Sequence, residues 1–549
     1  MILAATAGAS LAAAAAVAHA ADRQSGRSGT GRLAVVLVVD QLRADQPQIF
    51  GRPGQTGGFA RFFQGGVVYD SARFEHAFTL TAPGHATIFT GAHPSQHGIV
   101  ANLWYSRAER LRVESVQDTG YPEFGTAKGR SPRMLRIGTV GDRLLEATAG
   151  HSKVVAVSGK AHSAILSAGK RGKAFWYEPQ AGGFTTSTYY YDQLPTSVAR
   201  WNAVSLRKVP DSWSPLAVPG DGPVRNDTDE FERPPAGIGR GFPHALGVPG
   251  SAQSLANLRY SPYLDEVTLQ FAATLLEEWR LGEDADPDLL AISLSGTDYI
   301  GHAFGPDSLE MRDNLVRLDR ALASFFSLLD ETVGPDNYLV FLTSDHGVVP
   351  IPEYQAKLGL PAGRLGMENI SREVNLGLRR HFGVNLDLIE SFAAPFVYLN
   401  FDAAKSRGID REELVAKAAG LLEAIPGIAR VIRTDRPGLD AGEWAPLVRN
   451  AIDAERSGDL CVLQDPGVYL HDDAGKNATT HGSPYDYDRH VPLMMYAAAI
   501  DARRVTRPVS PAAIASSLAA YLGIPAPDGT QVEALAEIAG PARETHALD

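Results

Sequence analysis

The sequence of 549 residues predicts an α/β fold, a doubly wound and mostly parallel sheet with helices on both faces and inserted cap segments. Short apolar runs rich in β-branched residues recur along the chain, and they are continuous rather than alternating in polarity. Strands buried on both faces of a parallel sheet need such runs. Segments with helical periodicity lie between them, and this alternation is typical of a doubly wound sheet.

Each predicted element follows from its local pattern. The four predicted strands are, in order, LAVVLVVD (33–40), VVAVSGK (154–160), LLAISLSGTD (289–298) and YLVFLTSDHG (338–347). Apolar side chains recur at helical spacing over residues 262–281 and 309–333, and we predict a helix over each.

Two stretches break this rhythm. Residues from about 170 to 253 are rich in Gly, Pro, Tyr and Trp, with weak helix signals, and residues from about 349 to 477 lack acidic strand ends. We interpret both as insertions in a single domain spanning 21–549. They form either part of a substrate-facing cap or ordinary surface elaboration.

The first 20 residues are nearly all apolar and end in Ala18-His19-Ala20, which is typical of a secretory signal peptide. No Lys or Arg precedes Arg23, but a membrane anchor is the weaker interpretation because an Ala-rich stretch is only weakly apolar. We therefore expect a periplasmic or secreted protein that is not held in a membrane after cleavage. Cys461 is the only cysteine, which excludes an intrachain disulfide.

The formal net charge of −12 argues against nucleic acid or an anionic membrane as the main partner. It does not exclude a small anionic substrate, because a metal site can reverse the sign of the local field.

Acidic residues fall at the ends of three predicted strands: Asp40, Asp298 and Asp345. Ligands of open parallel sheets bind beyond the carboxyl ends of the strands, so these side chains are expected to meet there. Three carboxylates would repel one another strongly unless a cation neutralised them. The pattern therefore predicts a metal site.

Histidines accompany two of these carboxylates. His302 follows Asp298 by four residues, a step that a helical turn brings onto one face, and His346 directly follows Asp345. Mixed Asp/His ligation suits zinc, although manganese or iron can occupy similar sets. Taken singly, an Asp at a strand end is more often the cap of the next helix, and the DHG stretch is also typical of a turn.

The late segment THGSPYDYDRHVPL offers two further histidines. We predict that His481, which lies beside Gly482 in a loop-like stretch, is the remaining ligand. His490 is the alternative, because it precedes an apolar run and is otherwise a hydrogen-bonded histidine at the entrance of a strand.

Thr81 lies in the stretch TLTAPGHATIFTG, two residues before Pro83. Proline is favoured in the first turn of a helix, so Thr81 is expected just outside a helix start, where amides and the helix dipole favour negative charge. It is either a helix cap or a nucleophile activated by a neighbouring metal ion.

The ordered series of motifs from Leu33 to about Leu493 resembles the alkaline phosphatase superfamily. It is similar to the threonine-nucleophile branch, which includes secreted bacterial zinc alkaline phosphatases and nucleotide pyrophosphatase/phosphodiesterases. The motifs are VVD, TAPGHATIFTG, PSQHGIVANLWY, SGK, GTDYIGHAFGPDS, TSDHG and THGSPYDYD.

The resemblance implies two zinc ions per chain and a phosphothreonine intermediate on Thr81. The second zinc would stabilise the leaving oxygen and then activate the hydrolytic water. The implied ligands are Asp40, Asp345 and His346 for the zinc beside Thr81, and Asp298, His302 and His481 for the second.

The resemblance also covers three positions at which the family contacts the phosphate. Asn102 matches an asparagine that hydrogen-bonds a nonbridging oxygen, although asparagine is also common in turns. Lys160 matches the lysine of a Lys-x-Arg pair found in the phosphatase group, but His162 stands where the arginine is expected. A neutral imidazole lacks the bidentate fork and the charge of a guanidinium.

These residues predict a phosphoric monoester hydrolase of the alkaline phosphatase type, acting on small phosphate esters. A phosphodiesterase or nucleotide pyrophosphatase is the first alternative, favoured by His162. The second is a noncatalytic exported protein that binds metal or phosphate. A sulfatase fits less well, because that branch uses a cysteine- or serine-derived nucleophile.

Overall fold

The structure is a computed structural model that describes residues 31–51, 54–216, 229–472 and 475–539. The predicted signal peptide, residues 1–20, lies outside the described residues. Within the described ranges, no helix combines the length and the apolar character that crossing a membrane requires.

A nine-stranded sheet organises the larger part of the molecule, in the order β21-β2-β20-β13-β1-β12-β7-β8-β9. The five strands from β13 to β8 are parallel, whereas β20 and β9 run antiparallel to their inner neighbours. The bounds are β1 Leu33–Val39, β2 Val67–Tyr69, β7 Val154–Ser158, β8 Lys173–Glu178, β9 Gly183–Thr185, β12 Asp288–Leu294, β13 Tyr338–Thr343, β20 Leu493–Tyr496 and β21 Arg503–Val505. The predicted fold class is confirmed.

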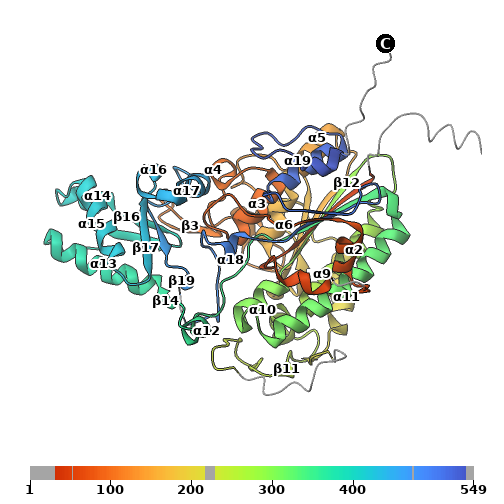
Figure 1. The fold of residues 1–549 in the computed structure, drawn as a ribbon, viewed down its shortest axis with the longest axis horizontal. Coiled ribbons are helices and arrows are strands. Elements are labelled where there is room, and N and C mark those ends of the chain that lie inside the picture. The colour runs from red at the N-terminus through yellow and green to blue at the C-terminus, as the bar shows by residue number, and fades with distance from the viewer. Residues whose placement is uncertain (1–30, 52–53, 217–228, 473–474, 540–549) are drawn as a thin grey trace, which may run out of the picture.

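Helices cover both faces of this sheet (Figure 1). One face packs against α2 (Gly58–Gly65), α9 (Tyr263–Glu278), α10 (Gly296–Phe304) and α11 (Leu309–Thr332), and the other against α3 (Thr81–Thr90), α5 (Val140–Ala147), α6 (Ala161–Ala168) and α19 (Ala513–Leu522). Side chains of β1 alternate between the two cores, with Leu37 in one and Val38 in the other. Burial on both faces explains why this strand is apolar throughout. Helices α9 and α11 confirm the two helical predictions.

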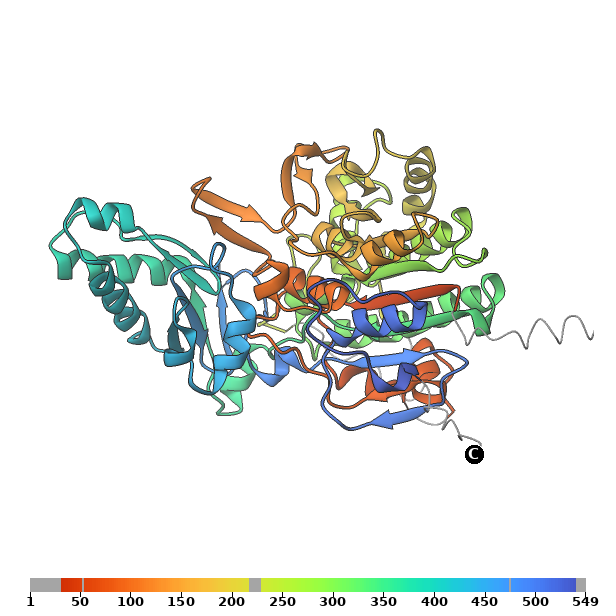
Figure 2. The same cartoon turned by 90° about the horizontal axis from the view of Figure 1, so that it is seen from above.

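A second lobe projects from one side of the sheet (Figures 1 and 2). Its antiparallel sheet has the order β15-β16-β18-β17, and its own apolar core lies between this sheet and α13 and α15. The bounds are α13 Met367–Phe382, β15 Ile389–Ala393, β16 Phe396–Leu399, α15 Arg411–Glu423, β17 Ile428–Arg433 and β18 Leu460–Gln464. The whole lobe lies in the sequence range expected as the later insertion.

The range 170–253, expected as the earlier insertion, contributes β8 and β9 to the edge of the main sheet. Strand β8 reads KAFWYE, so its buried Phe175, Trp176 and Tyr177 do not form the β-branched run by which the other strands were predicted.

The remaining α-helices and strands of the described residues are short. They are α4 Pro94–His97, β3 Leu103–Ser106, β4 Leu111–Glu114, β5 Gln117–Pro122, β6 Gly129–Arg130, α7 Thr196–Ser205, β10 Ser212–Trp213, β11 His244–Ala245, α8 Ala252–Asn257, α12 Pro352–Lys357, β14 Gly363–Gly366, α14 Phe401–Ser406, α16 Pro437–Asp440, α17 Ala445–Ala451, β19 Val468–His471 and α18 Asp486–Arg489.

Candidate active site and metal centre

The register of the parallel strands brings the candidate residues to one edge of the sheet. Val39 of β1 pairs with Leu294 of β12, and Val38 pairs with Thr343 of β13, so the three strands end at nearly the same level. The Asp40 amide donates to the Leu294 carbonyl at 3.0 Å. Residues that follow these strands must therefore converge.

Asp298 does not end a strand, as the sequence pattern predicted, but lies on helix α10. Strand β12 stops at Leu294, and the helix begins at Gly296, whose amide donates to the buried Asp265 carboxylate at 2.7 Å. That contact from α9 stabilises the helix start, where a free amide needs an acceptor. The predicted helical step is confirmed, because His302 Nε2 lies 3.2 Å from Asp298 Oδ1 one turn later.

Asp298, His302 and His481 form one candidate metal site, with one potential ligand atom from each lying within 4.8 Å of the others. His481 Nε2 is 3.7 Å from Asp298 Oδ1. His490 lies elsewhere, where its Nε2 is 3.0 Å from the Asp70 carbonyl oxygen. Between the two histidines that the sequence offered, the geometry favours His481.

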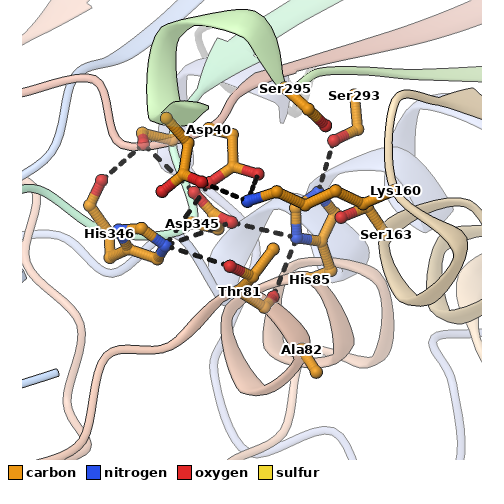
Figure 3. A network of polar contacts seen from close by, with 12 residues as sticks. Asp40, Thr81, Ala82, His85, Lys160, Ser163, Ser293, Ser295, Asp345 and His346 are labelled. Carbon is orange, nitrogen blue, oxygen red and sulfur yellow. Dashed lines mark hydrogen bonds and ion pairs between the residues drawn. The ribbon is translucent and has the colours of Figure 1, made fainter. Parts of the chain in front are cut away.

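A second group surrounds His346, whose Nε2 lies 3.4 Å from Asp40 Oδ1 and 3.6 Å from Asp345 Oδ2 (Figure 3). Potential ligand atoms of Asp40, Asp298 and His346 also lie within 4.8 Å of one another. Asp298 thus stands between the two groups rather than in only one of them. The rings of His346 and His481 stack at a centroid distance of 3.4 Å, which places the two groups side by side.

The three histidines share one orientation that suits metal binding. Each ring has Nδ1 within hydrogen-bonding distance of a backbone carbonyl, which can only accept, so Nδ1 carries a proton and Nε2 is the nitrogen available to a metal ion. These contacts are His302 to Thr479 at 2.8 Å, His346 to Gly347 at 2.9 Å and His481 to Thr79 at 3.0 Å.

The electrostatics of the cluster call for cations. Burial and the charges of Asp298 and Asp345 raise the pKa of Asp40 well above its usual value, and burial raises the pKa of Asp345 to about 7. Asp40 Oδ1 and Asp345 Oδ2 accept no hydrogen bond from the residues described. Burial also holds the pKa of His346 well below its usual value, so this ring is neutral and can act as a ligand. The donor set fits divalent metal ions such as zinc.

Lys160 supplies a single positive charge to this cluster. Its Nζ lies 2.7 Å from Asp40 Oδ2 (Figure 3). It also lies 2.6 Å from Asp298 Oδ2, although the family resemblance assigned this lysine to the phosphate. Although burial disfavours its charged form, Asp298 and Asp40 raise the pKa of the ammonium. One ammonium cannot balance the charge of three carboxylates, so the cluster can accept further positive charge.

Thr81 lies against the same cluster. Helix α3 begins at Thr81 itself, one residue earlier than predicted, with Leu80 as the residue before it and Pro83 in the first turn. The Thr81 hydroxyl is buried and lies 3.3 Å from His346 Nε2 (Figure 3). A Cβ added to Gly84 would lie 2.4 Å from the Asp345 carbonyl oxygen, so glycine lets this helix start approach the metal cluster closely.

Asn102 contacts the residue after Thr81, whereas His162 lies near Lys160 and His85. The Ala82 amide donates to Asn102 Oδ1 at 2.7 Å, which fixes the orientation of the side-chain amide and leaves its NH₂ group to donate elsewhere. His162 lies on α6, and its buried Nε2 has no hydrogen-bond partner among the described residues. Burial and the charge of Lys160 keep its pKa well below the usual value. It therefore adds no positive charge near neutral pH.

Gln41 was assigned no role from the sequence, where only its place directly after Asp40 marks it. Its backbone adopts a φ of 68°, in the left-handed region that residues other than glycine rarely occupy. The turn aims its amide at Asp345 Oδ1, 3.2 Å away, and its side-chain Nε2 donates to Asp298 Oδ1 at 2.8 Å. One residue thus orients carboxylates of both groups.

His85, in the middle of the PGHAT motif, was also missed. Its Nδ1 lies 2.9 Å from the Thr81 carbonyl and 3.2 Å from Asp345 Oδ2, and its Nε2 lies 2.9 Å from Ser293 Oγ (Figure 3). Burial lowers its pKa to about 4, so it is a neutral residue that ties the start of α3 to the sheet. Its place one helical turn after Thr81 is the signal that could have revealed it.

The sequence profile of the type I phosphodiesterase / nucleotide pyrophosphatase family matches residues 34–485. The alkaline phosphatase PhoV of Synechococcus elongatus is 32% identical over 521 residues, which cover 91% of this chain and 91% of PhoV. The alkaline phosphatase PafA of Elizabethkingia meningoseptica is 32% identical over 526 residues, which cover 93% of this chain and 94% of PafA.

Solved structures agree with these matches. The crystal structure of wild-type PafA has a TM-score of 0.85 at 30% identity, covering 93% of this chain and 99% of the PafA chain. Murine ectonucleotide pyrophosphatase / phosphodiesterase 5 shares the fold at 15% identity, with a TM-score of 0.52 over 90% of this chain and 95% of that chain. The chain belongs to the type I phosphodiesterase / nucleotide pyrophosphatase family, which confirms the resemblance found in its motifs.

Replacing Gln41 with Met should weaken zinc binding about 10- to 100-fold, because the Asp298 carboxylate loses the donor that orients it. Zinc affinity is measured by competition with a chelator. Gln64→Met on the exposed surface of α2 is the matched control and should bind zinc like the unmodified protein. Equal affinities for both variants would show that Gln41 does not position the ligand.

Zinc affinity should also fall as the pH drops below about 7. The pKa of Asp345 is raised to about 7 without metal, so protons compete with zinc below that value and leave the carboxylate free above it. One competing proton weakens binding about tenfold per pH unit. Chelator competition at pH 6 and pH 8 tests this, and affinities that do not differ after correction for the chelator would contradict it.

Proposed function

We propose that the protein is an exported alkaline phosphatase that hydrolyses phosphate monoesters through a phosphothreonine intermediate on Thr81. The observation that carries the proposal is the position of the Thr81 hydroxyl, at the start of a buried helix and 3.3 Å from His346 Nε2 in the Asp/His cluster. The names of PhoV and PafA, which match this chain over most of its length, support it.

Two zinc ions are the proposed cofactors. Asp40, Asp345 and His346 would hold the ion beside Thr81, and Asp298, with His302 and His481, would hold the other. Bound zinc would make the threonine hydroxyl acidic enough to lose its proton and would balance the charge that develops on the phosphoryl group. The three imidazoles that present Nε2 to the cluster and the carboxylate oxygens without hydrogen bonds from the described residues support this assignment.

Thr81 would act as the nucleophile in an in-line displacement. Its Oγ1 forms a bond to phosphorus while the bond to the leaving oxygen breaks, and the released alcohol takes up a proton from water. Water then attacks phosphothreonine, releasing inorganic phosphate and restoring the hydroxyl. The amides at the N-terminus of α3 favour the negative charge of the phosphoryl group throughout.

Asn102 would bind a nonbridging phosphoryl oxygen through its NH₂ group, since its Oδ1 already accepts from the Ala82 amide. Lys160 would bind another oxygen once metal ions neutralise Asp40 and Asp298, which its ammonium contacts now. A crystallised PafA variant is substituted at a threonine and an asparagine 21 positions apart, the same spacing as Thr81 and Asn102.

A diesterase or nucleotide pyrophosphatase of the same family is the second candidate, and His162 is the observation that favours it. The same PafA variant is also substituted at a lysine and an arginine two positions apart, the spacing that Lys160 and His162 have here. A diester carries one negative charge fewer than a monoester dianion and needs less cationic help. Lys160, a charge that only the monoester requires, keeps phosphatase activity as the preferred proposal.

The apolar leader that ends in Ala18-His19-Ala20 supports export to the periplasm or the medium. Small phosphate esters are the proposed substrates.

Thr81→Ala should lower kcat for an aryl phosphate at least about 1,000-fold, because no other group replaces the threonine hydroxyl as the in-line nucleophile. The exposed Thr119→Ala serves as the matched control and should keep full activity. The zinc content of both variants is measured as well, and equal values would show that the metal centre is intact. Undiminished turnover by Thr81→Ala would refute the threonine mechanism, and a wild-type protein without turnover would favour the noncatalytic alternative.

His162→Arg should raise kcat/KM for aryl phosphate about tenfold, since a guanidinium adds charge-assisted hydrogen bonds to a dianion. The same variant should change hydrolysis of bis-aryl phosphate little. Both rates are measured with added zinc. An unchanged or lower value for the monoester would show that residue 162 does not face the phosphate.

A further inference from the structure

A cavity of about 180 Å³ lies between the main sheet and the second lobe. Three residues of the candidate active site line it, namely Asn102, His302 and His481. It therefore opens directly from the metal group that contains His302 and His481. A substrate held at Thr81 and Asn102 has this space next to its phosphoryl group.

Both parts of the molecule contribute apolar side chains to the cavity, which polar side chains such as Gln464 and Thr480 also line. The apolar residues that matter here are Leu80 and Leu103 from the main part, and Met367, Ala394, Pro395 and Leu470 from the second lobe. In the described part of the chain, no Lys or Arg lines the cavity. The composition favours an uncharged group, because a buried charge without a partner is strongly disfavoured.

Asp472 is the one carboxylate among the described residues that line the cavity, and it is already paired. Arg112 Nη1 lies 3.1 Å and 3.2 Å from its two oxygens. The same guanidinium donates to the Phe392 carbonyl and, at 3.3 Å, to Ser391 Oγ. An anionic substituent entering the cavity would meet Asp472 and find this guanidinium engaged by other acceptors.

We infer that this cavity is the leaving-group subsite and that it selects monoesters of neutral, apolar alcohols about one aromatic ring in size. It disfavours leaving groups that carry a second phosphate or a carboxylate, including nucleoside polyphosphates. The inference rests on the proposed phosphatase function. The size is suitable, since an apolar cavity of about 150 Å³ accommodates benzene.

The second lobe thereby gains a role in specificity, because four of the six apolar residues named above belong to it. A single methylene in an apolar pocket changes kcat/KM by about 10- to 200-fold, so this surface is sufficient to discriminate between alcohols.

The first experiment compares two aryl phosphates that differ in charge but whose phenols have matched pKa values. One carries a para carboxamide and the other a para carboxylate. The carboxylate should have a kcat/KM at least about tenfold lower. Inhibition by benzylphosphonate should likewise be at least about tenfold stronger than inhibition by methylphosphonate. Equal values in both comparisons would overturn the subsite.

The second experiment narrows the cavity with Ala394→Phe. The ratio of kcat/KM for phenyl phosphate to that for methyl phosphate should fall at least about tenfold, because the introduced side chain occupies the space that the phenyl group of the substrate would fill. Leu376→Phe, at an exposed position of α13, is the control and should keep the wild-type ratio.

The outcomes separate the two proposals. A wild-type protein that hydrolyses none of these esters would remove both the phosphatase function and the subsite. One that hydrolyses all of them with similar kcat/KM, and whose ratio is unchanged by Ala394→Phe, would remove the subsite alone.

Discussion

Mutual repulsion among three buried carboxylates is the constraint on which the rest of the site depends. Asp40, Asp298 and Asp345 are almost completely buried, and the backbone around each is fixed by strand pairing or by a helix start. They cannot move apart without breaking the sheet edge. The cluster therefore either takes up protons, as the raised pKa of Asp345 indicates, or takes up cations. Lys160 meets part of this demand, and divalent ions suit the remainder.

The surrounding residues hold this unfavourable arrangement in place. Gln41 contacts both carboxylate groups from a strained turn, and His85 links the start of the nucleophile helix to the sheet. Each residue adopts a state that is unfavourable in free energy. Gln41 has a left-handed backbone, and His85 has a buried neutral imidazole. Backbone strain of this kind costs about 1–3 kcal/mol and persists only where its surroundings enforce it. Fixed positions are what a nucleophile and metal ligands require.

Much of the fold and site could be predicted because the information was local. Continuous apolar runs marked β1, β7, β12 and β13, and helical spacing marked α9 and α11. The four-residue step from Asp298 to His302 correctly indicated a shared helix face. The sequence patterns failed at two places. Strand β8 was missed because its buried residues are aromatic rather than β-branched. Asp298 was placed at a strand end, but a helix begins before it.

The sequence by itself determined the α/β class, the family and the residue types of the cluster, because the periodicity of apolar residues and the order of short motifs indicate them. Only the tertiary structure decided that Asp298 stands between two groups, that His481 rather than His490 joins them, and that Gln41 orients carboxylates of both. It alone placed a cavity between the lobe and the metal centre. The reason is separation along the chain, since Asp40 and His346 meet across hundreds of residues, and no local pattern encodes which distant side chains come into contact.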